Sequence, residues 1–485
     1  MHLSLMTDLY QLTMAQGYHR AGRGTDEGVF HVFFRTAPFG GAYAVACGVD
    51  AAIDWLGDLR FDDAQVTWLA TLRAGDGTPL FGTDFLDHLA GLRCTLDVDA
   101  VAEGTVLFPN EPAIRVRGNL IEAQLAETAL LTLFNFPTLI ATKAARVTEA
   151  AGGGPVLEFG LRRAQGPDGG LTASRAAYIG GAAATSNVLA GQRFGVPVRG
   201  THAHSWVMSF GDELEAFRAY AHALPNNVVL LVDTWDAEQG IRNAVTVGKE
   251  MAARGQALAG VRLDSGDLVA LSKRARAELD AAGLTDARVV ASNDLDEHVI
   301  ADLRARGARV DTWGVGTRLV TGGEQAALGG VYKIGAVRSA GAAWRPCLKV
   351  SETPAKTSIP GQLQVRRLRD ADGRLAGDVI WNEDAPPGDR VERVHAGTRD
   401  TVGPALVGVD LLQPRLRGGA RPSPSPGLHE QTARARARAH DDLLALAEPH
   451  RRLHDPLPYP VALEAGLHDL RVQMIERARG ASSPR

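Results

Sequence analysis

Two histidines stand two residues apart in the segment "VRGTHAHSWVMSF", which runs from Val198 to Phe210. Side chains alternate between the two faces of a β-strand, so His202 and His204 would point the same way on a strand. Such a pair suits a metal ion, because imidazole is a common metal ligand. A reactive histidine beside a structural one fits the same spacing. The segment alone leaves both interpretations open.

Polar and charged residues follow several apolar runs in the middle of the chain, where a buried strand would not need them. They are Arg162 and Arg163, Thr201 to Ser205, Asp233 and Asp236, Arg262, Asp264 and Asp267, Ser292 to Asp294, and Gly314, Gly316 and Thr317. If the runs are parallel strands of one barrel, their C-terminal ends meet at one rim, where such folds build active sites. The pattern therefore predicts a single site.

Some of these residues also have a structural explanation. Asp264 with Asp267, and Asp294 with Glu297, stand where helices are expected to begin, and acidic residues often cap helix N-termini. The two glycines fit an ordinary turn, since a lone G-x-G is a weak signal.

The arginines Arg162 and Arg262 are harder to explain structurally. An arginine that ends a buried strand inside a rim needs an anionic partner. Together with a glycine–threonine turn that offers backbone N–H groups and with several carboxylates, they suit a substrate that carries phosphates and a divalent cation.

The elements that would position these residues form three regions. Residues 151–335 alternate short β-branched runs with amphipathic segments. We expect strands in "PVLEFGLR", "VPVRGTHAH", "VVLLVDTW", "AGVRLDSGD", "ARVVASND" and "VDTWGVGTRLV", and a helical segment in "SRAAYIGGAAATSNVLAGQRFG". Repeated strand-then-helix units favour a parallel sheet with right-handed crossovers, closed here into an α/β barrel. Residues 1–150 and 336–485 are predicted as N-terminal and C-terminal α+β domains.

Composition excludes several classes of protein. The formal net charge of −4, with 45% hydrophobic and 22% charged residues, indicates a globular protein with no general attraction to nucleic acid or to an anionic membrane. Three cysteines far apart provide neither a disulfide framework nor a thiolate zinc site. No signal peptide and no apolar run of membrane length is expected, so a cytoplasmic location is predicted.

Nine strings, in this order and along nearly the whole chain, resemble nicotinate phosphoribosyltransferase. They are "TDLYQLTMAQGY", "FFRTAPFGGAYAVACG", "FGLRRAQGPDGGLTASRAAYIGG", "TSNVLAG", "PVRGTHAHSWVMSF", "VRLDSGDL", "ASNDLDE", "WGVGTRLVT" and "LGGVYKI". The resemblance implies an irregular parallel α/β barrel of the type II phosphoribosyltransferase kind, with flanking α+β domains. It also implies an ATP-dependent ligase of NAD biosynthesis, in which nicotinate and phosphoribosyl pyrophosphate give nicotinate mononucleotide and pyrophosphate while ATP becomes ADP and phosphate. Mg²⁺ is the implied cofactor, and a homodimer is the implied assembly.

The resemblance also implies a role for the second histidine of the pair. In the family, the histidine that accepts the phosphoryl group of ATP follows "GT-x-A", which makes it His204 and leaves His202 at the variable position.

Substrate-binding residues are implied in the same way. Arg162, Gly314, Gly316 and Thr317 are expected to bind phosphate, and Arg262 and Thr201 to bind nicotinate. Phe159 and Tyr10 are expected to stack on the pyridine ring, and Asp264 and Asn293 to make further substrate contacts. Tyr10 is expected to come from the partner subunit, so that the active site is shared across the dimer interface. The residues that hold ATP and Mg²⁺ stay unassigned, since there is no G-x-x-x-x-G-K-[ST] motif.

Two alternatives belong to other classes. One is a metal-dependent hydrolase of the amidohydrolase type, with His202 and His204 as a ligand pair. The other is a phosphosugar-binding or regulatory protein on the same barrel, without catalytic activity. Metal content would identify the first, and binding without turnover the second.

Overall fold

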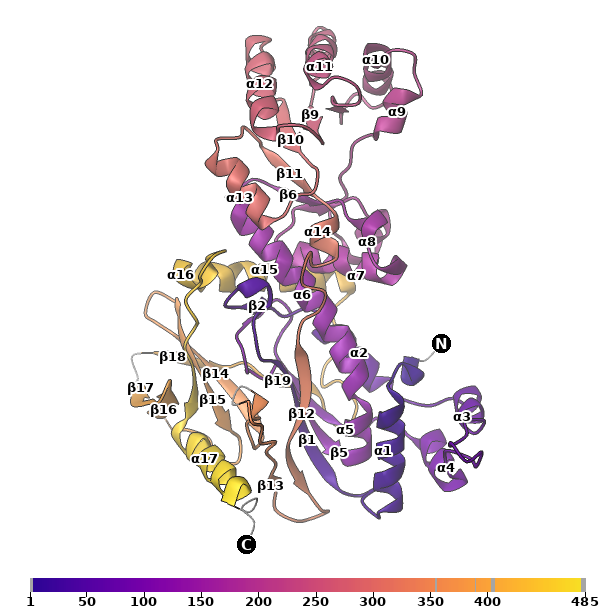
Figure 1. The fold of residues 1–485 in the computed structure, drawn as a ribbon, viewed down its shortest axis with the longest axis vertical. Coiled ribbons are helices and arrows are strands. Elements are labelled where there is room, and N and C mark those ends of the chain that lie inside the picture. The colour runs from indigo at the N-terminus through magenta and orange to yellow at the C-terminus, as the bar shows by residue number, and fades with distance from the viewer. Residues whose placement is uncertain (1–2, 354–355, 389, 403–405, 481–485) are drawn as a thin grey trace. The chain divides into compact units, whose positions relative to one another are not determined.

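The computed structural model describes residues 3–353, 356–388, 390–402 and 406–480 (Figure 1). The chain divides into two compact units. Unit 1 comprises Met1–Leu139, Ala327–Gly427 and Ala437–Arg485, and unit 2 comprises Ile140–Ala326 and Leu428–Arg436. The segments predicted as N-terminal and C-terminal domains therefore fall largely into one unit, and the predicted three-domain division stays a prediction.

The described residues of unit 1 form two six-stranded sheets and a two-stranded one. The first sheet has the order β13 (Arg345–Pro346), β12 (Gly330–Arg338), β1 (Glu27–Phe34), β5 (Ile114–Asn119), β3 (Asp97–Ala100) and β19 (Gln413–Leu416). The second has the order β17 (Thr398–Val402), β16 (Val391–His395), β20 (Val461–Glu464), β15 (Leu375–Asn382), β14 (Leu363–Arg369) and β18 (Val407–Asp410). The small sheet pairs β2 (Ala44–Val45) with β4 (Val106–Leu107).

The helices of unit 1 are mostly short. They are α1 (Leu9–Arg20), α2 (Val49–Gly57), α3 (Asp63–Leu69), α4 (Thr83–Gly91), α5 (Leu120–Leu125), α16 (Glu448–Arg451) and α17 (Ala465–Gly480), with 3-10 turns at Leu3–Leu5 and Pro38–Gly40. Two longer helices, α6 (Glu127–Ala151) and α15 (Leu428–Ala445), run from one unit into the other.

The core of unit 1 forms around β1, a central strand whose sequence "EGVFHVFF" is apolar on both faces. It pairs antiparallel with β12 and β5, and seven of its eight residues are buried. Aromatic and β-branched side chains favour such a strand because they pack well on a pleated surface. Phe30 stacks on Tyr332 of β12, with ring centroids 4.8 Å apart. The apolar side chains of β5 and α5 complete this core.

Unit 2 is built on one parallel sheet with the order β7 (Ala184–Thr185), β6 (Val156–Glu158), β11 (Thr312–Val315), β10 (Arg288–Ala291), β9 (Gly260–Leu263) and β8 (Val229–Leu231). Its helices are α7 (Gly166–Ile179), α8 (Val188–Phe194), α9 (His204–Met208), α10 (Glu213–Ala223), α11 (Ala237–Ala252), α12 (Leu268–Ala281), α13 (Glu297–Ala305) and α14 (Thr317–Val320), with a 3-10 turn η3 at Leu161–Arg163. Helices α10, α11 and α12 lie side by side in chain order (Figure 1). This is the strand-then-helix repeat expected of parallel α/β folds.

The sheet of unit 2 differs from the prediction in two ways. Five of the six predicted strands form, but "VPVRGTHAH" contributes only an isolated bridge between Val198 and Thr185. The sixth strand is β7, which lies in a segment predicted to be helical. The ladder ends at β7 on one side and at β8 on the other, so the topology does not confirm a closed barrel.

The predicted acidic helix caps were right in one case. Asp267 accepts N–H groups of the first turn of α12. At α13 the capping residue is Asp296 rather than Asp294, because the chain continues two residues further before the helix begins. Asp264 caps no helix and contributes to the site described below.

Helices α5 and α6 together span Leu120–Ala151, the one stretch in the described residues that is long and apolar enough to cross a membrane by length and composition. The prediction that no such run exists was therefore wrong. Of its most apolar window, 61% is buried inside the structure, as in a core helix of a globular protein. The predicted cytoplasmic location stays a prediction.

Candidate active site

The C-terminal ends of five strands of unit 2 carry the polar residues singled out in the sequence. Because the strands are parallel and adjacent, the residues that follow β6, β8, β9, β10 and β11 emerge at the same edge of the sheet. Hydrogen bonds between residues about 30 positions apart connect them into one group.

Arg262, on β9, is the centre of this group. Its Nε donates to Ser292 Oγ (2.8 Å), one terminal nitrogen to Thr201 Oγ1 (3.1 Å) and the other to Asp264 Oδ1 (2.8 Å). The guanidinium carbon also lies 5.7 Å from the ring centroid of Phe159. Three of the five guanidinium N–H groups are engaged in these contacts, so two remain for a ligand. The side chain is 14% exposed, which keeps it reachable from solvent.

Asp264 is held in place by its backbone as well as by its side chain. Asp233 Oδ2 accepts the Asp264 N–H (2.6 Å) and the Ser265 hydroxyl (2.7 Å). Burial raises the pKa of Asp264, but the hydrogen bond from Ser292 and the charge of Arg262 outweigh burial and keep the pKa below its usual value. The carboxylate is therefore ionised at neutral pH.

His204 is the first residue of α9 and is partly open to solvent, with 39% of its side chain exposed. Its Nδ1 lies 3.1 Å from Thr234 Oγ1, and its Nε2 lies 3.7 Å from Asp264 Oδ2. The imidazole is thus oriented by a hydroxyl on one side and faces a carboxylate on the other. This arrangement suits a nucleophile or a proton-transfer group.

His202 has a different environment. Its side chain is buried, Nε2 accepts the N–H of Leu231 (3.1 Å), and Nδ1 lies 3.3 Å from the Ala203 carbonyl oxygen. An acceptor at Nε2 and a carbonyl at Nδ1 describe a neutral ring with its proton on Nδ1. Burial is the main cause that lowers the pKa of His202. The ring links its segment to the edge strand β8.

The two histidines therefore do not form a pair of metal ligands. They do not lie on a strand, and the nitrogen of His202 that could bind a metal accepts a backbone hydrogen bond. Within the described part of the chain, no three His, Cys, Asp or Glu side chains group closely enough to hold a metal ion.

Phe159 and Arg162 belong to a turn that follows β6. Glu158, fully buried, accepts hydrogen bonds from the Gly160 N–H and from the hydroxyls of Ser174 and Thr185. The Phe159 N–H donates to the Val315 carbonyl of β11 (2.8 Å). These bonds fix the turn that presents the Phe159 ring.

Two glycines let the same turn pack against β11 and α14. A Cβ at Gly314 would come within 2.9 Å of the Phe159 ring, and a Cβ at Gly160 within 2.3 Å of Val320. Their role in the structure is therefore close packing. Arg162, in η3, is exposed.

Asn293 and Thr317 lie exposed at the ends of β10 and β11. Asn293 has φ of +129°, which is rare for a residue with a side chain, and its Oδ1 accepts the Asp294 N–H (2.8 Å). Such strain is found at functional sites when the surrounding structure imposes it. Gly316 precedes the short helix α14, which begins at Thr317.

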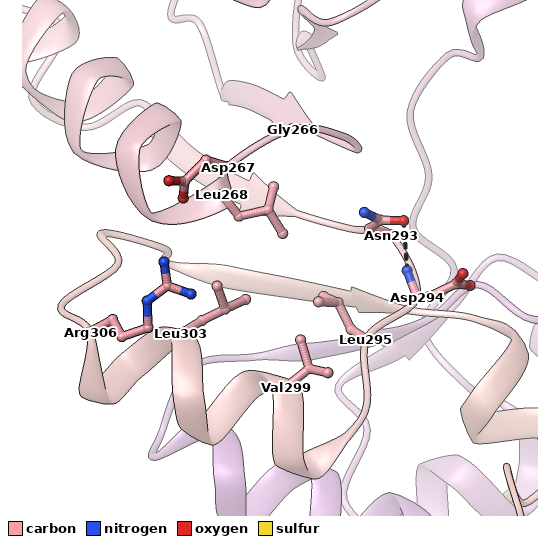
Figure 2. Close-up of a pocket in the computed structure, with 9 residues that line it drawn as sticks. All are labelled: Gly266, Asp267, Leu268, Asn293, Asp294, Leu295, Val299, Leu303 and Arg306. Atoms are coloured by element: carbon pink, nitrogen blue, oxygen red, sulfur yellow. Dashed lines mark hydrogen bonds between the residues drawn. The ribbon is translucent and has the colours of Figure 1, made fainter.

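A cavity of about 300 Å³ opens beside Asn293, between the β9–α12 loop and α13. Figure 2 shows Leu295, Val299 and Leu303 pointing into it from below and Leu268 from above. Arg306 lies at one end and Asn293 with Asp294 at the other. Asn293 follows Ser292 directly, so this cavity adjoins the Arg262 group.

Three segments match profiles of one family. Residues 5–135 match the nicotinate phosphoribosyltransferase (NAPRTase) N-terminal domain, residues 156–371 the NAPRTase family, and residues 362–471 the C-terminal domain. The chain belongs to the nicotinate phosphoribosyltransferase family. The residues that follow β6, β8, β9, β10 and β11 all lie in the second of these segments.

Nicotinate phosphoribosyltransferases from distant organisms are similar over nearly their whole length. The protein of Bacillus subtilis (strain 168) is 41% identical over 484 residues, which cover 98% of this chain and 96% of the relative. The protein of Homo sapiens is 38% identical over 527 residues, covering 96% and 95%. The crystal structure of human nicotinic acid phosphoribosyltransferase matches with a TM-score of 0.82 at 36% identity, covering 96% of this chain and 99% of that one.

The site residues predicted from the nicotinate phosphoribosyltransferase motifs are distributed unevenly. Thr201, His204, Arg262 and Asp264 form one connected group, with Phe159 against Arg262. Arg162, Asn293 and Thr317 are exposed beside it. Tyr10 lies on α1 in unit 1 with 48% of its surface exposed, and its role stays a prediction.

Two supporting residues, Glu158 and Thr234, were missed as members of the site. Asp233 and Ser292 were predicted among its strand-end residues but without a role, because nothing local indicated their partners. Glu158 and Thr234 carried no signal, since each acts on a residue whose position the fold decides.

Proposed function

We propose that the protein transfers the phosphoribosyl group of phosphoribosyl pyrophosphate to nicotinate and couples this to ATP hydrolysis. The products are nicotinate mononucleotide, pyrophosphate, ADP and phosphate. The observation that carries the proposal is the half-engaged guanidinium of Arg262 beside the Phe159 ring. A planar cation next to an aromatic face suits a flat ring that bears a carboxylate.

The transfer breaks the bond between the anomeric carbon and the pyrophosphate oxygen and forms a bond to the pyridine nitrogen. Charge develops on the leaving pyrophosphate and on an oxocarbenium-like ribosyl centre. Arg162, the turn Gly314–Gly316 and Thr317 are proposed to bind the phosphates, with Asn293 as a further substrate contact. Their support is their place at the same strand ends as Arg262.

His204 is proposed as the residue that accepts the γ-phosphoryl group of ATP. The phosphorus–oxygen bond of ATP breaks, a phosphorus–nitrogen bond forms and ADP leaves; water later releases phosphate from the histidine. The partial exposure of His204 and its orientation by Thr234 support a nucleophile at this position.

Mg²⁺ is proposed as the cofactor that neutralises the leaving pyrophosphate. The rim provides no cage of three or more ligands in the described residues, but Mg²⁺ usually binds one or two carboxylates together with substrate phosphates and water. The exposed carboxylates of Asp236 and Asp294 offer oxygen ligands of that kind. When bound, the ion would offset negative charge on the phosphates.

A homodimer with a shared active site is part of the proposal, with Tyr10 of the partner subunit as a stacking face for the pyridine ring. Helix α1 exposes three apolar side chains, Leu9 (52%), Tyr10 (48%) and Met14 (39%). Exposed apolar residues clustered on one helix fit an interface better than a surface in water. Mixing Tyr10→Ala with His204→Ala subunits tests this point, because mixed dimers would regain one complete site. No recovery on mixing would contradict a shared site.

The main test is product analysis with nicotinate, phosphoribosyl pyrophosphate and Mg²⁺, with and without ATP. We expect nicotinate mononucleotide in both cases, more of it with ATP, and an acid-labile phosphoryl label on the protein. His204→Ala is expected to lose the label and the ATP stimulation while keeping slow transfer. Labelling that persists in His204→Ala, or that moves to His202, would contradict the assignment.

The two alternatives receive less support. A hydrolase with a His202–His204 metal pair needs the Nε2 of His202, which accepts a backbone hydrogen bond. Stoichiometric zinc in the purified protein would support the hydrolase instead. Substrate binding without any turnover would instead favour a phosphosugar-binding protein.

A further inference from the structure

Arg415 lies at a β-bulge in β19, the edge strand of the first sheet of unit 1. The pairing of β19 with β3 skips Arg415, which is the extra residue of the bulge. A bulge changes the direction in which a side chain points, and bulges are often found next to functional sites. The following residue, Leu416, is buried in the core, whereas the side chain of Arg415 is half-buried.

The guanidinium of Arg415 has no partner among the described residues. Its Nε is buried without a hydrogen bond, and no ion pair joins the side chain to a carboxylate. Burial is the main cause that lowers the pKa of Arg415. The charges of Arg438 and Arg421 lower this pKa further, although Asp50 and Glu103 oppose them. Nearly all buried polar groups are hydrogen-bonded, and an unmatched one calls for a water or an ion that would complete it.

The charged groups around Arg415 are engaged with other partners. Arg421 forms an ion pair with Asp54 (2.6 Å), and Arg438 donates to the Glu103 carbonyl oxygen (2.5 Å). The carboxylate of Glu103 accepts a backbone N–H instead (2.6 Å). These contacts hold the two arginines in place, and most of the donors of Arg438 remain available to a ligand.

We propose that Arg415 binds an oxyanion of the phosphate type, with Arg438 and Arg421 as flanking cations. The planar fork of a guanidinium matches two oxygens of such an anion, and it is more weakly hydrated than an ammonium. A phosphate group carries roughly −1.5 to −2 charges near neutral pH, which suits more than one arginine. A carboxylate brings a single charge and only two oxygens.

This site belongs to unit 1, whereas the strand-end site belongs to unit 2. It uses neither His204 nor Arg262, so the proposed phosphoribosyl transfer does not depend on it. A phosphate at Arg415 would stabilise unit 1, because a ligand that binds only the folded state shifts the folding equilibrium toward that state.

The test is equilibrium dialysis of the full chain against radiolabelled inorganic phosphate. Arg415→Met should bind one phosphate fewer per chain than the wild type. Arg417→Met is the matched control two residues further along, because Arg417 already pairs with Asp99 (2.5 Å) and should keep the wild-type number. Phosphate held by the strand ends of unit 2 stays the same in all three proteins, so the difference reports on Arg415.

Two further measurements define the ligand class and the geometry. Sulfate should compete with phosphate for this site, whereas chloride and acetate at equal ionic strength should compete about tenfold less. Arg415→Lys keeps the charge but loses the fork, so it should bind phosphate about tenfold more weakly than the wild type. This variant also keeps the test decisive if Arg415→Met does not fold.

Thermal unfolding gives an independent measurement. In phosphate-free chloride buffer, Arg415→Met should be at least as stable as the wild type, because the substitution removes a half-buried charge that has no partner. Phosphate at about ten times its dissociation constant should raise the melting temperature of the wild type by about 2–5 °C, and that of Arg415→Met by clearly less.

Three results would overturn the site. The first is equal phosphate binding by the wild type and both Arg415 variants, and the second is equal competition by chloride and sulfate. The third is a lower stability of Arg415→Met than of the wild type in phosphate-free buffer. That result would show that the guanidinium has a protein partner in solution, such as Asp50 or an acid of a second copy of the chain.

Discussion

Arg367 in unit 1 and Arg262 in unit 2 are both strand residues beside an aspartate, but their surroundings are opposite. Arg367, on β14, is 2% exposed, and its guanidinium donates to Asp378 (2.7 Å), Asp442 (3.2 Å) and the Val106 carbonyl (2.7 Å). Burial lowers the pKa of Arg367, but the charge of Asp378 and its hydrogen bonds outweigh burial and raise it. Every nitrogen of this group has a protein partner.

The difference teaches how to tell a structural arginine from a site arginine. Arg367 is enclosed, with two aspartates opposite its single charge, whereas Arg262 shares one aspartate with His204 and keeps two N–H groups for a ligand. Removing Arg367 should lower the stability of the fold, and changing Arg262 should weaken substrate recognition. The predictions below test this contrast, from the largest expected effect to the smallest.

Arg367→Met should lower the free energy of unfolding by about 3–5 kcal/mol, because it leaves Asp378 buried without its cation, whereas Asp442 keeps Arg369. Urea unfolding followed by circular dichroism measures the change. Arg366→Met is the matched control on the same strand, since the Arg366–Asp410 pair is partly exposed and should contribute about 1 kcal/mol or less. Equal losses in the two variants would contradict the structural role given to Arg367.

Arg262→Lys should lower kcat/KM for nicotinate about 10-fold to 100-fold, because an ammonium keeps the charge but loses the planar fork of donors. The free energy of unfolding should change by less than about 1 kcal/mol, because the lysine ammonium can keep the ion pair with the partly exposed Asp264. Arg262→Gln should lower the preference for nicotinate over nicotinamide further. Specificity constants for both bases provide the measurement, and unchanged selectivity in both variants would contradict the assignment of Arg262.

His31, buried on β1, should make unit 1 sensitive to acid. Its Nε2 accepts the Leu363 N–H (3.0 Å), and burial, aided by the charge of Arg115, lowers the pKa of His31 to about 3. Below about pH 6.5 the unfolded chain binds a proton that the folded protein does not, so stability falls as the pH drops toward 3, by up to about 1.4 kcal/mol per pH unit. Above about pH 6.5 the ring is neutral in both the folded and the unfolded protein, so this loss of stability does not occur.

The variant His31→Gln isolates this effect, since the amide oxygen can still accept the Leu363 N–H but does not titrate. Urea unfolding at pH 7.5 and 5.5 should show a larger loss for wild type than for the variant, by about 1 kcal/mol. Parallel losses in both proteins would mean that other groups cause the acid sensitivity.

Ser292→Ala should have the smallest effect. It removes the hydroxyl between Arg262 Nε and Asp264 Oδ1, but Arg262 and Asp264 keep their direct ion pair (2.8 Å), so neither charge loses its partner. We expect KM for nicotinate to rise by a few-fold with kcat nearly unchanged, measured in steady-state assays. Ser292→Thr, which keeps the hydroxyl, should restore most of the affinity. A fall in kcat alone would place Ser292 in the chemical step instead.

Much of the site was predictable because its residues follow apolar runs. Five of the six predicted strands exist, and Arg262, Asp264 and His204 come together after them. The elements that were predicted wrongly are short or irregular. The strand β7 has only two residues inside an alanine-rich segment, and Val198 makes only a single bridge. Two-residue strands have no periodicity to detect.

Sequence alone determined the alternation of strands and helices in unit 2, the polar residues at the strand ends and the family to which the chain belongs, because periodicity and motifs are local properties. Only the tertiary structure decided which histidine is exposed to solvent and which is buried, and which residues contact each carboxylate oxygen of Asp264. Those outcomes depend on hydrogen bonds between residues about 30 positions apart, such as His202 with Leu231 and Arg262 with Ser292. The sheet brings these residues together, and no local pattern encodes the distance between them.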